Sequence, residues 1–167
     1  MEEISRLKLE EYKKELQSLQ ESVPELVRKK QDARAEGDLR ENTEYDIAST
    51  ELTKTLMRIT RLEEIMSDVK VIEPDHGQYI TLGSFVEIFS EQCPDVGKLI
   101  LRLDNEGNIL AEEEYNQVLS IHSTLGTAIL NGTSGIYTVQ TESGQIQWNV
   151  RKVPFEEIAK RFNLPEF

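Results

Sequence analysis

The residues best suited to chemistry lie in one short stretch. Four carboxylates fall within nine residues: Asp38, Glu41, Glu44 and Asp46. Carboxylate oxygens are good ligands for Mg²⁺, which often takes one or two of them from a protein and its other ligands from substrate and water. Asp38 and Glu41 could therefore supply part of a metal site. The remaining ligands would have to come from a partner.

The same stretch also fits a purely structural role. Gly37 is typical of the end of a helix, and Asp38 followed three residues later by Glu41 matches the capping box that begins the next one. Acidic residues in a first turn also complement the helix dipole, each by roughly 0.3–1 kcal/mol. Spacing alone favours capping, whereas the number of carboxylates favours binding chemistry.

Basic residues precede and enter this stretch: Arg28, Lys29, Lys30, Arg34 and Arg40. They could form a solvated helix face with local ion pairs, or a small patch for one strand of nucleic acid. The chain as a whole carries a net charge of −12, which disfavours general nucleic-acid binding. Both interpretations of the basic residues stay open at this point.

Two apolar seams flank the acidic stretch and predict an antiparallel helical hairpin within residues 7–73. In both seams the spacing alternates between three and four. The first contains Leu9, Tyr12, Leu16, Leu19, Val23 and Leu26. The second contains Tyr45, Ala48, Leu52, Thr55, Ile59, Leu62 and Met66. The first helix would be roughly 40 Å long at about 1.5 Å per residue, so the acidic residues would lie at the tip of an arm.

Two positions in these seams are weak. Pro24 predicts a kink in the first helix or, alternatively, the start of a new helix after a Ser22 cap. Thr55 is the one weak member of the second seam, and we expect the neighbouring Leu56 to cover it.

The second half has short β-rich runs and predicts a small, mostly antiparallel α+β domain. We expect strands at 84–89, 99–103, 118–122, 136–141 and 146–153. A short helix should follow the Ser123 cap, and Pro154 should open a final amphipathic helix. The expected organisation is a hairpin over 1–75 and a globular domain over 80–167, which ends in a helical extension at 154–167.

Composition excludes several classes of protein. No apolar run approaches the ~20 residues needed to span a bilayer, and the start, Met1–Glu3, lacks the apolar core of a secretion signal. A single cysteine, Cys93, allows no intrachain disulfide. The sequence contains no phosphate-binding glycine loop, no metal-spaced Cys or His pair and no Gly-x-Ser-x-Gly motif. We expect a cytoplasmic protein that does not contact membranes.

Three segments resemble the Gre family of bacterial transcript-cleavage (transcription elongation) factors, most closely its GreA type. Gly37–Tyr45 is similar to the family's Gly-Asp-Leu-x-Glu-Asn-x-Glu-Tyr tip. Ser123–Leu130 resembles its Ser-Pro-x-Gly-x-Ala-Leu-Leu helix, and Thr141–Gln145 its final hairpin. The resemblance extends from about Leu7 to Val153, and it implies a coiled-coil arm followed by a globular domain of FKBP-like fold.

The resemblance also implies a function. The globular domain would dock at the rim of the secondary channel of RNA polymerase, and the arm would enter the channel. Asp38 and Glu41 would then hold a Mg²⁺ ion shared with polymerase and promote cleavage of the 3′ end of backtracked nascent RNA. The tip would be shaped by Leu39, Asn42, Glu44 and Tyr45. Arg34 and Arg40 are the candidate RNA contacts.

In this scheme the chain is an accessory factor rather than an enzyme. It would act as a monomer with no stably bound cofactor, and the active site would be that of polymerase. Residues 101–114, Thr124 in place of the family's proline and the extension at 154–167 depart from the pattern. One alternative is therefore a polymerase-binding relative that modulates transcription without cleavage. A prolyl isomerase is another, although its proline pocket would need more aromatic side chains than the chain offers.

Overall fold

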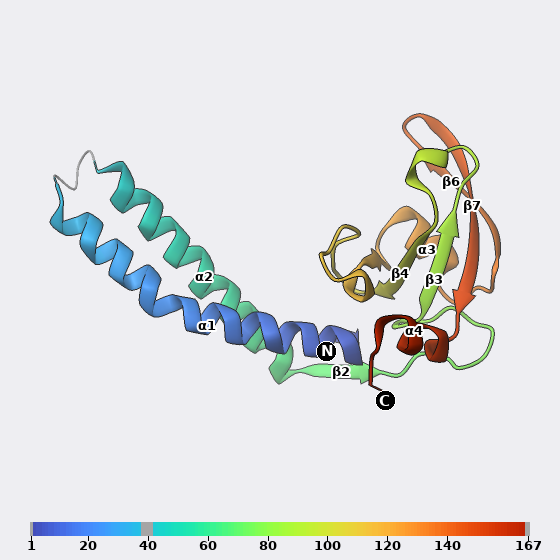
Figure 1. The fold of residues 1–167 in the computed structure, drawn as a ribbon, viewed down its shortest axis with the longest axis horizontal. Helices are drawn as coiled ribbons and strands as arrows, with labels where there is room; N and C mark the ends of the chain where they lie inside the picture. The colour runs from blue at the N-terminus through green and yellow to red at the C-terminus, as the bar shows by residue number, and fades with distance from the viewer. Residues whose placement is uncertain (1, 38–41, 166–167) are drawn as a thin grey trace. The chain divides into compact units, whose positions relative to one another are not determined.

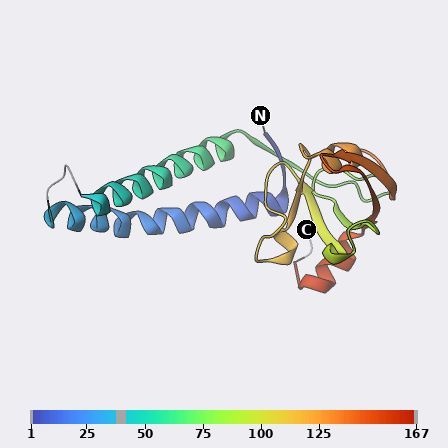
Figure 2. The same cartoon turned by 90° about the horizontal axis from the view of Figure 1, so that it is seen from above.

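Two long helices form an arm and follow from the two apolar seams. The computed structural model describes residues 2–37 and 42–165, and in it α1 spans Arg6–Ala35 and α2 spans Thr43–Ser67. The helices run antiparallel and side by side (Figure 1, Figure 2). Every residue of the two predicted seams is buried or half-buried. The expected helical hairpin is confirmed.

Pro24 lies inside α1 without ending it. Ser22 does not cap a new helix, because its hydroxyl donates to the carbonyl of Leu19 at 2.7 Å within the same helix. Proline removes the N–H that would bond to the carbonyl four residues earlier, and the exposed position of Pro24 leaves that carbonyl open to water. The alternative of a second helix beginning at Pro24 is therefore wrong.

The weak position in the second seam is not covered as expected. Leu56 is 45% exposed, whereas Thr55 is half-buried. The Thr55 hydroxyl donates to the carbonyl of Glu51 at 2.9 Å, so its polar group is satisfied within α2. The seam therefore accepts a threonine directly, without shielding from its neighbour.

A pair of short strands corrects the predicted helix boundaries. Strand β1, Glu2–Ser5, precedes α1, and β2, Val69–Ile72, follows α2; together they form a two-stranded sheet. Residues 69–72 were expected to belong to the helical hairpin, but α2 ends at Ser67. The β-branched side chains of this segment favour extended backbone, and β1 supplies the strand it pairs with.

The second half builds a five-stranded sheet in the order β5-β4-β3-β7-β6. The strands are β3 Phe85–Phe89, β4 Leu99–Asp104, β5 Val118–Ser120, β6 Gly135–Thr141 and β7 Gly144–Val153. Only the β4–β5 pair is parallel among these neighbours. All the expected strands are present within two or three residues of their predicted bounds, and the α+β fold class is confirmed.

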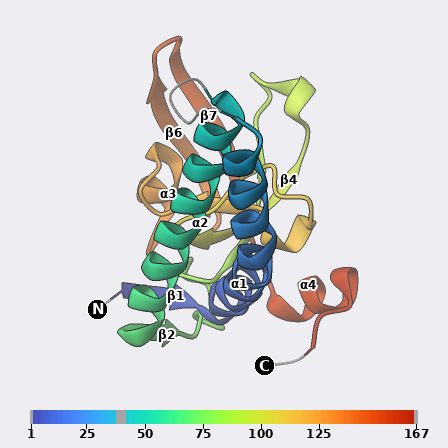
Figure 3. The same ribbon diagram turned by 90° about the vertical axis from the view of Figure 1, so that its left-hand side faces the viewer.

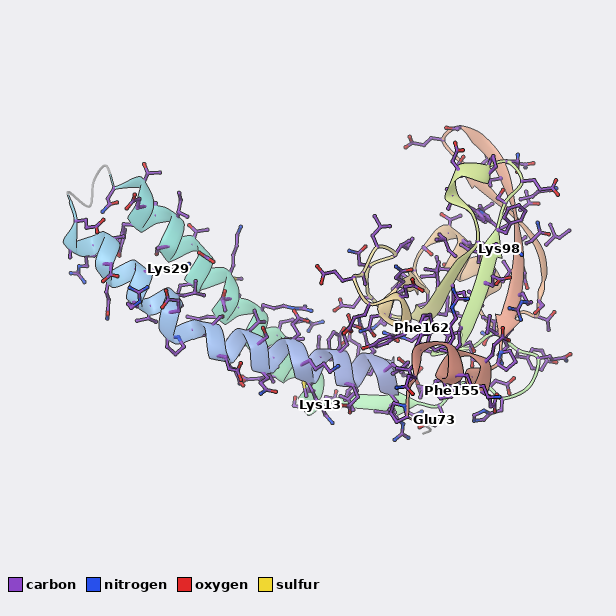
Figure 4. All side chains as sticks on the ribbon, viewed as in Figure 1. Lys13, Lys29, Glu73, Lys98, Phe155 and Phe162 are labelled. Carbon is purple, nitrogen blue, oxygen red and sulfur yellow. The ribbon has the colours of Figure 1, made fainter. Side chains whose placement is uncertain are left out.

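Alternating residues of the sheet pack against two different helices. Helix α3, Thr124–Ile129, covers one face, where Val86 and Leu101 belong to the main apolar core. Helix α4, Phe155–Phe162, packs on Phe85, which belongs to a second apolar cluster on the opposite face; Phe155 and Phe162 are labelled in Figure 4. The amphipathic helix predicted after Pro154 is therefore part of a core.

The chain divides into two compact units. The helical arm is the unit that contains Leu9–Val69, and the globular unit contains Glu3–Lys8 and Lys70–Phe167. Glu3–Lys8 thus belong to the unit built mainly from the second half of the chain, although they precede the arm in sequence.

A buried polar cluster holds that N-terminal segment inside the globular unit. Arg102 and Asp104 are both fully buried, and Arg102 Nε donates to Asp104 Oδ2 at 2.8 Å. The same carboxylate accepts from the Ser5 N–H at 3.3 Å and from the Ser5 hydroxyl. Arg102 Nη1 donates to the Tyr115 carbonyl and to Asn116 Oδ1, each at 3.1 Å. Burying charge is tolerated only with such compensation, so these bonds tie Ser5 firmly to β4.

Candidate functional site at the turn of the arm

The candidate site lies where α1 ends and α2 begins. Residues Asp38, Leu39, Arg40 and Glu41 lie outside the described residues, so their proposed roles stay predictions. The structure describes both helix ends beside them, at Ala35 and Thr43. The site can therefore be built from the residues that hold these two ends.

Asn42 fastens the two helix ends together. It is the N-cap of α2, and its Oδ1 accepts from the Tyr45 N–H at 3.0 Å. Its Nδ2 donates across the turn to the carbonyl of Ala33 at 2.5 Å, in the last turn of α1, where that carbonyl also accepts from the Glu36 N–H at 3.4 Å. One side chain therefore satisfies groups on both helices.

This arrangement corrects the expected capping box. The sequence pattern assigned the cap of the second helix to Asp38 and its reciprocal partner to Glu41. Helix α2 begins only at Thr43, and Asn42 caps it. Asparagine is as good an N-cap as aspartate, so the sequence contained this signal four residues later. Capping of α2 consequently requires neither Asp38 nor Glu41.

The described carboxylates near the turn do not form a metal site by themselves. Glu44 and Asp46 are exposed in the first turn of α2, where they complement its dipole. Within residues 2–37 and 42–165, no group of three or more His, Cys, Asp or Glu side chains is arranged to hold a metal ion. Asp38 and Glu41 have the oxygen donors that suit Mg²⁺, and they would need ligands from a partner.

Comparison with known proteins identifies the family. Residues 3–71 match the family model described as the N-terminal part of transcription elongation factors of the GreA and GreB type. The transcription elongation factor GreA of Ureaplasma parvum is 30% identical over 156 residues, covering 90% of this chain and 96% of that protein. The chain belongs to the GreA family of transcription elongation factors.

Other GreA-family relatives match over similar lengths. The GreA of Thermotoga neapolitana is 30% identical over 153 residues, covering 90% of this chain and 95% of that protein. The crystal structure of GreA factor homolog 1 of Thermus thermophilus covers 90% of this chain and 96% of that chain, with 23% identity and a TM-score of 0.41.

The basic residues of this GreA-family arm fall into two groups. Arg28 is engaged locally: its guanidinium bonds to Glu25 at 2.9 Å and to Asp32 at 2.8 Å. The hydrogen bond from Arg28 holds the pKa of the Glu25 carboxyl below its ordinary value. Lys29 (Figure 4) and Arg34 are both exposed, and neither forms an ion pair with any residue the structure describes. The solvated-face interpretation therefore fits Arg28, and Arg34 remains a candidate contact.

Lys30 has a different role at the same end of the arm. Its Nζ lies 5.7 Å from the centroid of the Tyr45 ring, and both side chains are half-buried. This cation–π contact links α1 to α2 one turn below the Asn42 bridge. Two independent side-chain contacts thus hold the helix ends on either side of residues 38–41.

The globular unit contains a cavity of about 400 Å³ between the 74–78 loop, the ends of β3 and β7, and the start of α4. Lys152 does not serve as a reactive amine there, because its Nζ donates to the carbonyls of Asp75 at 2.5 Å, Gly77 at 2.9 Å and Tyr79. Partial desolvation raises the pKa of Asp75, but the N–H groups of Tyr79 and Gly77 and the Lys152 charge outweigh it and hold that pKa low. This lysine organises the loop.

No helix among the described residues combines the length and the apolar character needed to cross a membrane.

Proposed function

We propose that this chain binds RNA polymerase, inserts the tip of its arm into the secondary channel and stimulates polymerase's own cleavage of the 3′ end of backtracked nascent RNA. Arrested complexes would thereby resume elongation. The observation that carries the proposal is the Asn42 cap, because α2 then requires neither Asp38 nor Glu41 as its cap.

Asp38 and Glu41 supply two carboxylates, which are too few oxygen ligands to complete a Mg²⁺ site by themselves. When bound in the complex, a Mg²⁺ ion shared with polymerase would stabilise negative charge on the reacting oxygens. The two tip carboxylates would hold this ion and orient a water molecule toward the RNA. The accompanying catalytic groups belong to polymerase, so the chain is an accessory factor and holds no cofactor alone.

Described residues join the helix ends on either side of the tip. The Asn42 side chain bonds to the Ala33 carbonyl of α1, and Lys30 of α1 lies over the ring of Tyr45 in α2. Leu39 and Glu44 complete the shape of the tip. Exposed Arg34, together with Arg40, is suited to the phosphates of the RNA end, because arginine forms charge-assisted hydrogen bonds with phosphate oxygens.

The remaining parts of the proposal concern location and docking. The globular unit docks at the rim of the secondary channel, and a single copy of the chain serves one polymerase in the cytoplasm. The net charge of −12 suits a basic protein surface better than bare nucleic acid.

The test is RNA shortening in stalled, backtracked polymerase complexes with purified wild-type protein, Asp38→Asn and Glu41→Gln. Glu36→Gln is the matched control, because Glu36 is an exposed carboxylate beside the tip that has no assigned role. We expect wild-type protein and the control to shorten the RNA and the two tip variants to lose this activity while still binding polymerase. Full activity in both tip variants would contradict the proposal.

A binding-only modulator is the second candidate. It would compete with an established cleavage factor for polymerase without shortening RNA. The presence of both tip carboxylates in the sequence favours the cleavage factor.

A further inference from the structure

Strand β6 is the last strand of the five-stranded sheet (Figure 3), and its sequence lacks the features that usually protect an edge. Its sequence, Gly135–Thr141, contains no charged residue and no proline. It pairs with β7 in an unbroken register from Gly135↔Val150 to Thr141↔Gly144, without a bulge. Natural sheets normally protect an edge strand with charged residues, prolines or bulges, because an unprotected edge is a template for another strand.

The side chain of Gln92 reveals which way the backbone groups point. It donates to the Gln145 carbonyl at 3.1 Å and accepts from the Gln147 N–H at 2.6 Å, continuing the pairing on the β3 side of β7. Backbone groups alternate sides along a strand, so Ile146 and Trp148 direct theirs toward β6.

The pairing register carries this alternation onto β6. Val139 and Tyr137, the partners of Ile146 and Trp148, direct their backbone groups to β7. The residues in alternate positions direct theirs out of the sheet: Ile136, Thr138 and Gln140. Within the described part of the chain, no hydrogen bond satisfies these outward N–H and C=O groups. Their side chains are exposed as well, Ile136 by 69%.

We propose that β6 pairs with β6 of a second copy of this chain, antiparallel about a two-fold axis at Thr138. In this register Thr138 lies opposite its own copy, and Ile136 lies opposite Gln140. Each outward N–H then meets a C=O of the other copy, because the set of outward residues is symmetric about Thr138. The two sheets join into one.

The absence of charge along this edge favours a second copy of the chain as its partner. Two chains of net charge −12 repel each other over most of their surfaces. The outward positions of β6 and the exposed neighbours on β7, which are Gln145, Gln147 and Asn149, carry no charge. Two acidic copies can therefore approach closely along this edge. The pairing concerns free protein at raised concentration and is separate from the action of one copy on polymerase.

The test is the molar mass of the full chain by sedimentation equilibrium from low micromolar to near-millimolar concentration. Thr138→Lys places two ammonium groups opposite each other in the pair. Thr50→Lys is the matched control, since Thr50 is exposed on α2 and the same substitution gives the same net charge away from β6. We expect concentration-dependent dimers for wild type and Thr50→Lys, and association about tenfold weaker for Thr138→Lys.

Hydrogen exchange of the Thr138 amide provides a second readout. In wild-type protein its exchange should slow as the concentration rises, whereas the Val139 amide, already bonded to β7, should not change. A monomer at every concentration would overturn the proposal, as would a dimer that Thr138→Lys leaves intact. A monomer whose polymerase binding is weakened by Thr138→Lys would assign the edge to polymerase instead.

Discussion

The helical arm and the globular unit treat charged side chains in opposite ways. In the arm, Arg58 joins the two helices through Glu15 at 2.7 Å, yet the two side chains remain 35% and 36% exposed. In the globular unit, Arg102 and Asp104 are paired with no exposure at all. The arm is held by its apolar seams and keeps its charges in water, whereas the globular unit builds a charge pair into its interior.

This difference has energetic consequences. Exposed ion pairs contribute about 0–1 kcal/mol each, because water and salt screen them. Removing one partner of a buried pair costs several times more, since the other charge is left without compensation. Substitutions at an exposed ion pair of the arm should therefore lower the free energy of unfolding much less than substitutions at the buried pair of the globular unit.

The largest effect is expected at the buried pair. Asp104→Ala should lower the free energy of unfolding of the globular unit by about 3–5 kcal/mol, because Arg102 and the Ser5 groups lose their shared acceptor. Urea denaturation followed by the fluorescence of Trp148 measures this change. Glu91→Ala, which removes an exposed carboxylate away from this cluster, is the control. A loss below 1 kcal/mol for Asp104→Ala would show that the pair is not essential.

The arm should be most sensitive in its seam. Leu62 has no exposure, so Leu62→Ala should cost about 2–5 kcal/mol through lost burial and a cavity. Leu56→Ala, on the exposed side of the same helix, should cost less than about 0.5 kcal/mol. Circular dichroism at 222 nm during denaturation compares the two. Equal effects would contradict the assignment of the seam.

The next largest effect is expected at Asn42, which bridges the two helix ends. Asn42→Ala should cost about 1–2 kcal/mol of helical stability, because it removes the cap of α2 and the bond to Ala33. It should also slow RNA cleavage, because the bond between the two helix ends beside the proposed tip residues is lost. Thr43→Ala, one residue further on, is the control. Unchanged cleavage in the Asn42 variant would show that the bridge serves folding alone.

The smallest effect is expected at an exposed pair on the arm. The folded-state pKa of Glu25 lies below its ordinary value, so this pair favours folding above that ordinary value and loses its contribution as pH falls through the folded pKa. Arg28→Ala should raise the pKa of Glu25, as followed by an NMR titration of its carboxyl carbon. Lys29→Ala should change it less, because Lys29 acts only through a weaker charge interaction. An unchanged pKa of Glu25 in Arg28→Ala would refute this pairing.

Much of the fold could be predicted from periodicity. Seam residues such as Tyr12 and Leu62 repeat along the helices, and strand residues alternate between the two faces of the sheet. The boundary near Val69 could not be placed, because its strand needs β1, which lies at the other end of the arm in sequence. The residue at which this helix ends thus depends on a partner strand that local sequence patterns do not reveal.

The buried cluster lay beyond the reach of sequence patterns for a similar reason. Arg102 and Asp104 alternate with apolar residues on β4, which resembles a strand with a solvated face. Their burial depends on Ser5, on the carbonyl of Tyr115 and on Asn116, which come from two separate parts of the chain. Only the folded arrangement shows that these charges are satisfied inside.

At the candidate site, the sequence identified the tip but misplaced the cap. Asp38 and Asn42 are both good N-cap residues, and the pattern chose the first. The structure assigns the cap to Asn42, which separates the capping role from the tip carboxylates. The roles of Asp38 and Glu41 stay predictions.

The most direct test measures two properties of one variant, Asp38→Asn. We predict that stimulated RNA cleavage in backtracked complexes falls by roughly a hundredfold, while the free energy of unfolding of the arm changes by less than about 0.5 kcal/mol. That result would place Asp38 in the chemistry and leave capping to Asn42. Retained cleavage combined with a loss of stability like that of Asn42→Ala would contradict it, because Asp38 would then serve the fold rather than the reaction.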